Sequence, residues 1–446
     1  MREKLREFFR DKKVLVLGFG REGRSTYRLL REMLPEQKIT IADQREGLAE
    51  DVPELARDAY VEIVGGERYL EGLDKYDIIM KAPGISFAKL EVEGWQEKIY
   101  SQLEVLLELF GGTTIGVTGT KGKSTTSTLT YQVLQDQGIP SLLMGNIGVP
   151  VFDELDLIRD ETVLVLEMSS HQLEFMRRSP KVAVLLNVHE EHLDHYRSFR
   201  EYALAKCNIF KYQESDDKFF YGADNEALRG LVAEVGERAQ SFRVGMDEND
   251  EVCLRDGEIW IGNEKVFATD EPRQLKGEYN LLNIAFVLGV AKELGLDLEK
   301  AKRTVAEFRT LPHRLEFVAE VNGVKFYDNS IGTVPAATEA AVRALGDVDT
   351  LIIGGMDRGL DYDEFVEFLN QSEISNVICM PKTGHDVADR LRAGRKVETL
   401  EEAVELAKKV TAVGKSCLLS PTAASYGFFK NFEEKGDLYQ KLVREN

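Results

Sequence analysis

The strongest signal in the chain is Thr114-Ile-Gly-Val-Thr-Gly-Thr-Lys-Gly-Lys-Ser-Thr-Thr126. An apolar, strand-like start runs into a glycine-rich turn and then into a helix-compatible segment. Such a turn lets the backbone approach a phosphate, and its amides and the following helix N-terminus point positive dipoles at it. We therefore predict a phosphate-binding loop in which Lys123 reaches the outer phosphates and Ser124 ligates Mg²⁺. Strict P-loop spacing needs glycine where this chain has Val117, so the loop is a variant, and an ordinary strand-to-helix turn is the alternative.

The bulk properties describe a multidomain protein. Its 446 residues exceed one compact core and suggest about three domains. With 57 basic and 77 acidic residues, the net charge of −20 argues against a nucleic-acid surface or an anionic membrane partner. Four widely spaced cysteines without a Cys-x-x-Cys pair are typical of a reducing compartment. Because no signal-peptide run or membrane-spanning apolar stretch is present, we expect a cytoplasmic protein.

Strand-like runs alternate with helical patterns in three blocks. The strand-like runs are 14–17, 38–42 and 78–80 in the first block, 114–118, 162–167 and 182–187 in the second, and 350–353, 377–380 and 416–419 in the third. The second block also holds a strand-and-turn excursion near 245–251 and a helical pattern over 280–294. This alternation predicts an α/β protein with mostly parallel sheets and three domains: a Rossmann-like domain (1–101), a central P-loop ATPase-type domain (102–311) and a C-terminal Rossmann-like domain (312–446).

A second glycine-rich loop, Gly18-Phe-Gly20-Arg-Glu-Gly23, directly follows the first strand-like run. Asp43 stands 20 residues after Gly23. By itself this pattern indicates a dinucleotide site with the acid on a ribose hydroxyl. Because an ATP-type loop is already present, we rank a non-redox nucleotide first, NAD(H) second and a purely architectural turn third. The turn 81–84, which ends in Gly84, has the composition expected where such sheets bind ligands.

Polar residues of the second block add to the phosphate-loop signal. Glu167 ends a buried-type strand and can hold Mg²⁺, although a simple strand-end acid is the alternative. Lys206 lies on a helical segment and by itself indicates a surface lysine. Asn280 and Asn283 fall on one helical face, where they can contact a nucleotide or cap a helix.

Three histidines, His189, His192 and His195, fall within seven residues. Their spacing is not H-E-x-x-H, and a related metallo-hydrolase motif would need histidine where Glu190 stands. We therefore take His192 as a metal or phosphate neighbour. Solvated loop histidines are the alternative for the other two.

These motifs together resemble the Mur ligase family, the ATP-dependent amide-bond-forming enzymes of peptidoglycan precursor synthesis. The resemblance covers nearly the whole chain and rests on segments 116–126, 167–174, 187–196, 202–206, 280–283 and 311–316. Segments 145–148, 419–425 and 429–433 are most similar to the glutamate-adding members. It implies a monomeric ligase that joins D-glutamate to UDP-N-acetylmuramoyl-L-alanine through an acyl phosphate. No nucleic acid or membrane insertion is implied.

The resemblance also implies a role for individual residues. Those near the UDP-sugar would be Arg21, Glu22, Asp43, Arg45, Gly84 and Asn146. Those that hold ATP would be Gly119, Thr120, Gly122, Lys123, Ser124, Thr125, Asn280, Asn283, His313 and Arg314. Two Mg²⁺ sites would use Ser124, Glu167, His192 and a carbamylated Lys206. The catalytic residues would be Lys123, His192 and Lys206, and those near the amino acid Thr333, Arg358, Ser425 and Phe432.

The chain departs from the glutamate-adding pattern in the third block. Where those enzymes usually read Asn-Asp-Ser-Lys, this chain has Asp328-Asn-Ser-Ile331, and Arg358 stands where a lysine is usual. Both changes fall near the implied amino-acid pocket. An L-glutamate-adding relative, or another Mur-type amino-acid ligase, is therefore an alternative. An NAD-dependent oxidoreductase and a nucleotide-regulated binding protein are the alternatives from other classes.

Overall fold

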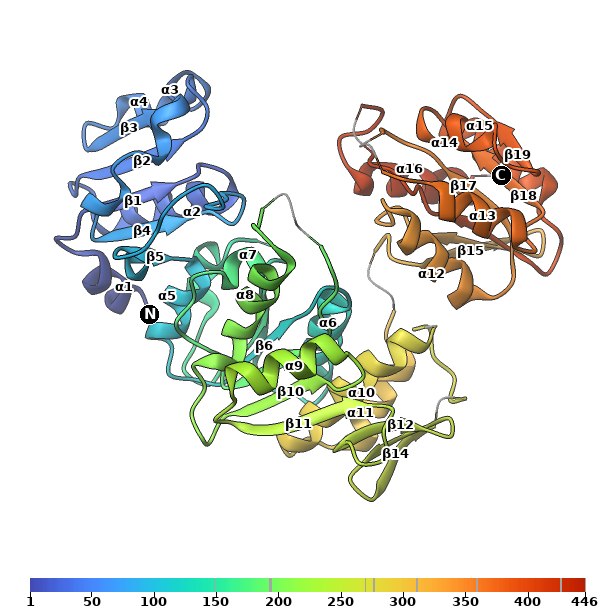
Figure 1. Cartoon of the computed structure of the whole chain (residues 1–446), viewed down its shortest axis with the longest axis horizontal. Helices are drawn as coiled ribbons and strands as arrows, with labels where there is room; N and C mark the ends of the chain where they lie inside the picture. Colours follow the sequence, from blue (N-terminus) through green and yellow to red (C-terminus); the bar gives the residue numbers. More distant parts are fainter. Residues whose placement is uncertain are drawn as a thin grey trace. The chain divides into compact units, whose positions relative to one another are not determined.

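Three β-sheets follow one another along the chain (Figure 1). The computed structural model describes residues 1–147, 149–191, 195–268, 270–275, 277–309, 312–357, 360–425 and 427–445. The chain forms two compact units, one of Met1–Glu271 with Leu282–Ala306 and one of Pro272–Leu281 with Glu307–Asn446. The first two sheets belong to the first unit and the third sheet to the second. The predicted α/β class with three sheet-forming blocks is confirmed, whereas the predicted domain boundaries stay predictions.

Sheet A is fully parallel, with strand order β3-β2-β1-β4-β5. Its strands are β1 (Val14–Leu17), β2 (Ile39–Asp43), β3 (Val61–Gly65), β4 (Ile78–Lys81) and β5 (Ile99–Tyr100), and its helices are α1 (Arg2–Phe9), α2 (Arg21–Met33), α3 (Leu48–Asp51) and α4 (Pro53–Arg57). All residues of β1 are buried, because Val14 and Val16 belong to one hydrophobic cluster and Leu15 and Leu17 to another. Burial on both faces explains the unbroken apolar run that predicts this strand.

Sheet B is the largest sheet, with order β14-β13-β12-β11-β10-β9-β6-β8-β7. Its strands are β6 (Thr114–Thr118), β7 (Ser141–Gly145), β8 (Val163–Glu167), β9 (Val182–Leu185), β10 (Lys218–Gly222), β11 (Gln240–Gly245), β12 (Val252–Arg255), β13 (Glu258–Ile261) and β14 (Glu264–Ala268). The strands from β7 to β12 pair in parallel, and the last two add an antiparallel meander. The strand-and-turn excursion predicted near 245–251 opens this meander.

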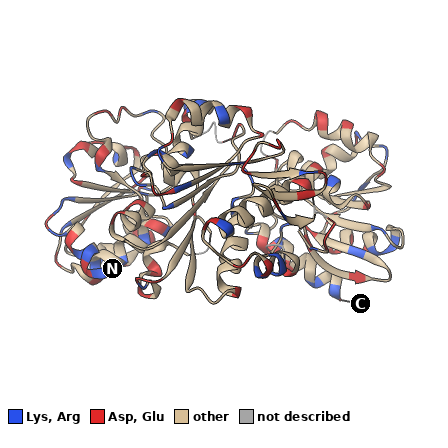
Figure 2. Ribbon diagram, turned by 90° about the horizontal axis from the view of Figure 1, so that it is seen from below, with Lys and Arg blue, Asp and Glu red and all other residues tan. Residues whose placement is uncertain are grey.

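The helices that accompany sheet B are α5 (Gln102–Leu109), α6 (Lys123–Asp136), α7 (Ser170–Leu173), α8 (Phe199–Lys211), α9 (Glu226–Val235), α10 (Glu278–Glu293) and α11 (Leu298–Glu307). The predicted helical pattern 280–294 corresponds to α10. In Figure 2 the residues coloured as charged lie mainly on helices and loops, while the strands are mostly tan. None of the helices in the described ranges is long and apolar enough to cross a membrane.

Sheet C has the order β15-β16-β20-β17-β18-β19. Its strands are β15 (Glu316–Val321), β16 (Val324–Asp328), β17 (Val348–Ile353), β18 (Asn376–Cys379), β19 (Gly394–Lys396) and β20 (Ser416–Leu419), and its helices are α12 (Pro335–Leu345), α13 (Asp363–Gln371), α14 (Thr383–Ala388), α15 (Leu400–Val410) and α16 (Phe432–Arg444). Among the described strands of this sheet, β15 and β16 pair antiparallel and the other neighbouring strands pair in parallel. The carboxyl ends of β16, β20 and β17 are therefore neighbours, and the loops that follow these strands meet at one edge.

The four cysteines are free and buried. Cys207 and Cys253 belong to the first unit, and Cys379 and Cys417 to the second. The absence of a disulfide pairing agrees with the wide spacing of the cysteines in the sequence.

Candidate functional site

The predicted phosphate loop follows the carboxyl end of β6, which is an interior strand of sheet B. The strand ends at Thr118 and α6 begins at Lys123. Gly122 has a φ of +90°, and a Cβ atom there would lie 2.6 Å from Oδ1 of Asn283, so both the backbone and the space require glycine. Val117 lies inside β6, where it pairs with residues of β8 and β9. Its side chain therefore replaces a glycine at a position that is strand and not turn.

The ammonium group of Lys123 lies across this loop. Its Nζ donates hydrogen bonds to the carbonyl oxygens of Gly119 at 2.9 Å and Thr120 at 3.0 Å. Thr120 is buried and its hydroxyl also pairs with the hydroxyl of Tyr202, 2.9 Å away. The loop is thus a closed turn around a cation, which is the charge that phosphate oxygens require.

Glu167 ends β8 next to this loop, because its register partner in β6 is Val117. The side chain is 1% exposed, and its Oε1 accepts a hydrogen bond of 2.7 Å from Nδ2 of Asn146. Its Oε2 is buried with no hydrogen-bond partner among the described residues. A buried carboxylate oxygen without a partner is costly, and a cation would satisfy it. The residues present therefore fit a metal ion at this point.

Lys206 is not a surface lysine. It lies on α8 with 1% of its surface exposed, and its Nζ donates a 2.9 Å hydrogen bond to the carbonyl oxygen of Gly119. The Nζ atoms of Lys206 and Lys123 thus share one acceptor. Burial, and then the charge of Lys123, hold the pKa of Lys206 well below its usual range. The structure thereby brings together the loop, Glu167 and Lys206, and their predicted roles stay predictions.

The three clustered histidines differ in their surroundings. His189 is exposed, and its backbone amide donates to Oγ1 of Thr120. His192 lies outside the described residues, as does Arg358, so their predicted roles stay predictions. The interpretation of His195 as a solvated loop residue is wrong, because its ring is 6% exposed and its Nε2 lies 3.2 Å from Oε2 of Glu174.

Sequence reasoning missed a buried cluster around Glu174. Nζ of Lys81, at the end of β4, lies 3.0 Å from Oε2 of Glu174, beside His195. The Oγ of Ser86 donates to the carbonyl oxygen of His195 at 2.6 Å. Burial lowers the pKa of Lys81 against the effect of Glu174. The cluster ties the loop after β4 to the segment after β8. A strand-end lysine was the available signal, but its partners lie far along the chain.

The glycine-rich loop after β1 is held together by Asp43. The Asp43 carboxylate accepts hydrogen bonds from the backbone amide of Phe19 at 2.7 Å and from Nε of Arg45 at 2.8 Å. Burial alone would raise the pKa of Asp43, but these hydrogen bonds outweigh it and lower the pKa. A Cβ on Gly23 would lie 2.0 Å from the carbonyl oxygen of Gly18, so the helix approaches the turn only with glycine there.

Two further residues predicted near the UDP-sugar border the same region. Arg21 is the first residue of α2, and Glu22 follows it. Oε1 of Glu22 accepts a 2.9 Å hydrogen bond from Nε2 of Gln172 on α7, and burial raises the pKa of Glu22. Gly84 lies in the turn after β4, with open space around it. Asn146 instead donates to Glu167, so its substrate contact stays a prediction.

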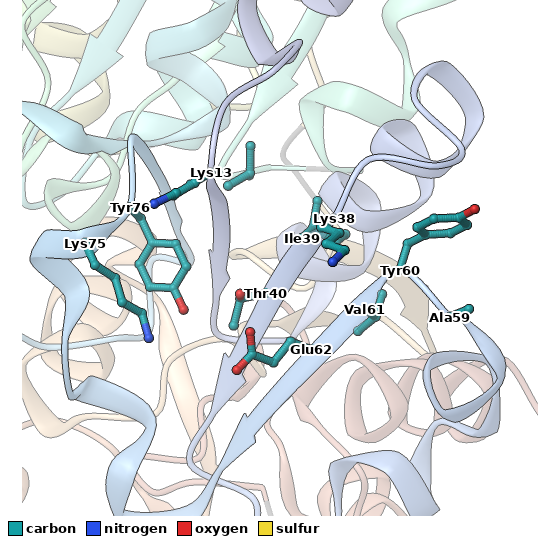
Figure 3. A pocket seen from close by; sticks show the side chains of 11 residues that line it. Lys13, Lys38, Ile39, Thr40, Ala59, Tyr60, Val61, Glu62, Lys75 and Tyr76 are labelled. Carbon is teal, nitrogen blue, oxygen red and sulfur yellow. The ribbon is translucent and has the colours of Figure 1, made fainter.

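A cavity of about 490 Å³ lies at the edge of sheet A where the strands begin, opposite the edge that carries the loops after β1 and β4 (Figure 3). It is lined from the amino ends of β1, β2 and β3, and Lys13, Lys38 and Lys75 stand around it. None of the predicted site residues belongs to this lining. The cavity is therefore separate from the loops that follow the strands.

In the second unit, His313 of the predicted His313-Arg314 motif forms a buried pair with a carboxylate. Nδ1 of His313 lies 2.8 Å from Oδ2 of Asp328, which ends β16. The bond to Asp328 raises the pKa of His313 against the effect of burial. Gly436 of α16 packs so closely that a Cβ there would lie 2.1 Å from Nδ1 of His313.

Asn280 and Asn283, predicted to hold ATP, are both buried on α10.

Three of the residues predicted near the amino acid are described, and they lie around the carboxyl edge of sheet C. Thr333 follows β16, Ser425 follows β20, and Phe432 begins α16. Ser425 is 3% exposed, and its hydroxyl has no hydrogen-bond partner among the described residues. Sequence reasoning missed the buried Lys435, three residues after Phe432, because α16 begins with charged residues that are typical of a solvated face.

Comparisons with known proteins agree over most of the chain. Residues 117–291 match the Mur ligase middle domain, and residues 313–422 match the Mur ligase, glutamate ligase domain. The chain is 32% identical to the UDP-N-acetylmuramoylalanine–D-glutamate ligase of Clostridium kluyveri, over 99% of this chain and 98% of the relative. It is 33% identical to the ligase of the same name from Acetivibrio thermocellus, over 99% of both chains.

Solved structures show the same fold. The MurF ligase from Thermotoga maritima in complex with ADP aligns with a TM-score of 0.61 at 20% identity, over 98% of this chain and 96% of its own. The UDP-N-acetylmuramate–alanine ligase MurC of that organism aligns with a TM-score of 0.59 at 17% identity, over 96% of this chain and 98% of its own.

Proposed function

The chain belongs to the Mur ligase family, and on that premise we propose that it adds D-glutamate to UDP-N-acetylmuramoyl-L-alanine. Membership makes it an ATP-dependent ligase of peptidoglycan precursor synthesis. The observation that carries the proposal is that Lys123 and Lys206 both bind the carbonyl oxygen of Gly119 in the closed loop, while Glu167 ends the strand next to β6. The full-length similarity to D-glutamate ligases supports the choice of substrates.

The proposed reaction has two steps. The terminal carboxylate of UDP-N-acetylmuramoyl-L-alanine attacks the γ-phosphate of ATP, which forms an acyl phosphate and releases ADP. The amine of D-glutamate then attacks the acyl carbon, and the tetrahedral intermediate expels phosphate as the amide forms. The amine loses its proton in this step. The ammonium group of Lys123 stabilises the charge that develops on the phosphoryl oxygens.

The residues that would hold Mg²⁺, at two sites, are Ser124, Glu167, His192 and a carbamylated Lys206. Bound Mg²⁺ would neutralise phosphate charge and orient the phosphoryl group. The unpartnered Oε2 of Glu167 supports this role. Burial of Lys206 favours its neutral amine, which is the form that reacts with carbon dioxide. The carbamate would replace a cation by an anion beside Lys123.

The binding roles of the remaining residues stay as predicted from the sequence. The loop after β1 and its neighbours Arg21 and Arg45 would hold the UDP-sugar. The loop after β6, with α10 and the His313-Arg314 motif, would hold ATP. The predicted cytoplasmic location, monomeric state and domain roles are part of the same proposal.

Ile331 and Arg358 favour a second candidate, the L-glutamate-adding reaction on the same UDP-sugar. In the sequence both stand where the resemblance to the D-glutamate-adding enzymes implies a lysine. The test is phosphate release with ATP, Mg²⁺, UDP-N-acetylmuramoyl-L-alanine and one of D-Glu, L-Glu, D-Asp or L-Lys. We expect release with D-Glu alone. Release only with L-Glu would favour the second candidate, and release with neither glutamate would refute both.

The role of Lys206 is tested by Lys206→Ala. We expect this variant to lose activity and to regain part of it with short carboxylic acids, which can supply the missing anion. Lys211→Ala is the matched control, because Lys211 is an exposed lysine on the same helix. Loss of activity without any rescue would count against the carbamate.

A further inference from the structure

Lys435 is a buried cation without a neutralising partner. It lies in the first turns of α16, is 2% exposed, and donates a 2.9 Å hydrogen bond from Nζ to the carbonyl oxygen of Gly354. Its Nζ also lies 5.4 Å from the centre of the Phe429 ring. No carboxylate of the described residues forms an ion pair with it, and burial alone lowers its pKa, to about 8. Lys435 therefore remains a cation at neutral pH.

A buried charge of this kind needs compensation. One carbonyl oxygen and one aromatic ring satisfy only part of an ammonium group, which has three donors. Desolvating an ion without a counter-charge is energetically unfavourable in proteins generally. The folded chain supplies no anion to Lys435 within its described residues. The arrangement thus calls for an anion from outside the chain.

The surroundings of Lys435 form a continuous edge built from three loops. The backbone amide of Gly354 donates to the carbonyl oxygen of Pro421 at 2.9 Å, and that of Met356 to Ala424 at 2.8 Å. The amide of Thr422 donates to the carbonyl oxygen of Gly332 at 2.9 Å. These bonds join the loops that follow β17, β20 and β16. Lys435 reaches the first of these loops through its own hydrogen bond.

The same edge holds polar groups that the chain itself leaves unused. The hydroxyls of Ser330, Thr422 and Ser425 are buried and have no hydrogen-bond partner among the described residues. Ser330 lies against Gly436, the neighbour of Lys435, since a Cβ on Gly436 would lie 2.5 Å from its Oγ. Buried hydroxyls normally find partners. A cation and three free hydroxyls at one sheet edge fit a ligand that carries a carboxylate.

We propose that Lys435 is the cation that binds one carboxylate of the incoming amino acid. The inference rests on the proposed function and deepens it. Glutamate brings two carboxylates, so its pocket needs more than one positive charge. Ile331 carries no charge, and Lys435 supplies a charge from α16.

The test uses the full chain and steady-state phosphate release with glutamate, ATP and the UDP-sugar varied in turn. Lys435→Met removes the charge, and Lys435→Arg keeps it. We expect Lys435→Met to raise the KM for glutamate about 10- to 100-fold, the range for a charged hydrogen bond. The KM values for ATP and the UDP-sugar should stay within about twofold, on the same scale. Lys435→Arg should recover most of the glutamate affinity.

Two further variants keep the result interpretable. Lys430→Met is the matched control, because Lys430 is exposed in the loop just before α16, and its KM values should equal those of the wild type. Lys435→Gln retains a hydrogen-bond donor but no charge, so its KM for glutamate should rise as in Lys435→Met. It gives the same test if Lys435→Met folds poorly. Equal glutamate KM in Lys435→Gln and wild type would overturn the inference.

The outcomes also separate this inference from the proposed function. Wild-type protein that releases no phosphate with either glutamate enantiomer would refute the proposed function itself. Wild-type activity with an unchanged glutamate KM in both neutral variants would refute only the role of Lys435. A rise in all three KM values together would also refute it, because that pattern indicates a general loss of structure.

Discussion

Replacing Gly436 by alanine is expected to destabilise the second unit, because the space that a methyl group needs is filled. A Cβ atom at this position would lie 2.1 Å from Nδ1 of His313, 2.5 Å from Oγ of Ser330 and 2.7 Å from Oδ2 of Asp328. Two of these atoms form the buried hydrogen bond between His313 and Asp328. Either that pair must separate or α16 must move away from the sheet.

The magnitude follows from three contributions. Overpacking a core position costs about 1–3 kcal/mol, and loss of a charged hydrogen bond costs about 1.5–3 kcal/mol. Alanine offsets about 1 kcal/mol, because it is the better helix former. The net expectation for Gly436→Ala is a loss of about 1.5–5 kcal/mol in the free energy of unfolding.

The loss should also depend on pH. Asp328 raises the pKa of His313 above its ordinary 6.5, so the pair stabilises the fold fully below that value. This stabilisation disappears as the pH rises through the pKa of the folded state. If the methyl group breaks the pair, the difference between wild type and Gly436→Ala must shrink as the pH is raised above 6.5.

The assay is urea unfolding of wild type and variant at several pH values, followed by circular dichroism. Gly230→Ala is the matched control, because Gly230 lies inside α9 with no atom near the position of a Cβ. That substitution should stabilise the protein by about 1 kcal/mol. A Gly436→Ala variant as stable as wild type, or stabilised like the control, would refute the reasoning.

Three other substitutions test the first unit. Lys123→Ala should reduce kcat by about 100- to 1,000-fold, measured as ADP formation, and full activity would contradict its role on phosphate. Asn146→Leu removes the hydrogen bond to Glu167, so the Mg²⁺ concentration for half-maximal activity should rise about 10- to 100-fold in a Mg²⁺ titration. Arg177→Met leaves the buried Glu104 without its partner, and calorimetry at neutral pH should show a loss of about 3–5 kcal/mol. Burial raises the pKa of Glu104 above 4.5, so this loss of stability should diminish as the pH falls toward that value and the carboxyl is protonated. A loss that does not change with pH would contradict the role of Arg177 as the partner of a buried carboxylate.

Much of the fold was predictable because its signals are local. The strand, turn and helix of 114–126 need only apolar residues, then glycines, then helix formers, and all of these are contiguous. Strands such as β1 and β20 coincide with their predicted ranges, since burial on both faces of a parallel sheet demands unbroken apolar runs.

The rest depends on contacts between distant parts of the chain. Lys435 and Gly354 are 81 positions apart, and nothing near either residue predicts that they meet. Lys206 is buried because its face of α8 packs under the loop after β6, a choice of face that a short helical pattern does not reveal. His195 is likewise buried beside Glu174, which lies 21 positions earlier in the chain. Roles on substrates depend further on molecules that the sequence does not contain, and they stay predictions.

The four buried cysteines provide each unit with its own probe of local opening. Only a thiolate reacts with an alkylating reagent, and burial raises the pKa of Cys207, Cys379 and Cys417 to about 12. Labelling therefore waits for the surrounding structure to open. Cys207 and Cys253 report opening of the first unit, and Cys379 and Cys417 that of the second. Mass spectrometry after timed labelling would follow the opening of both units in the wild-type chain. It would also show in which unit a bound nucleotide slows cysteine labelling.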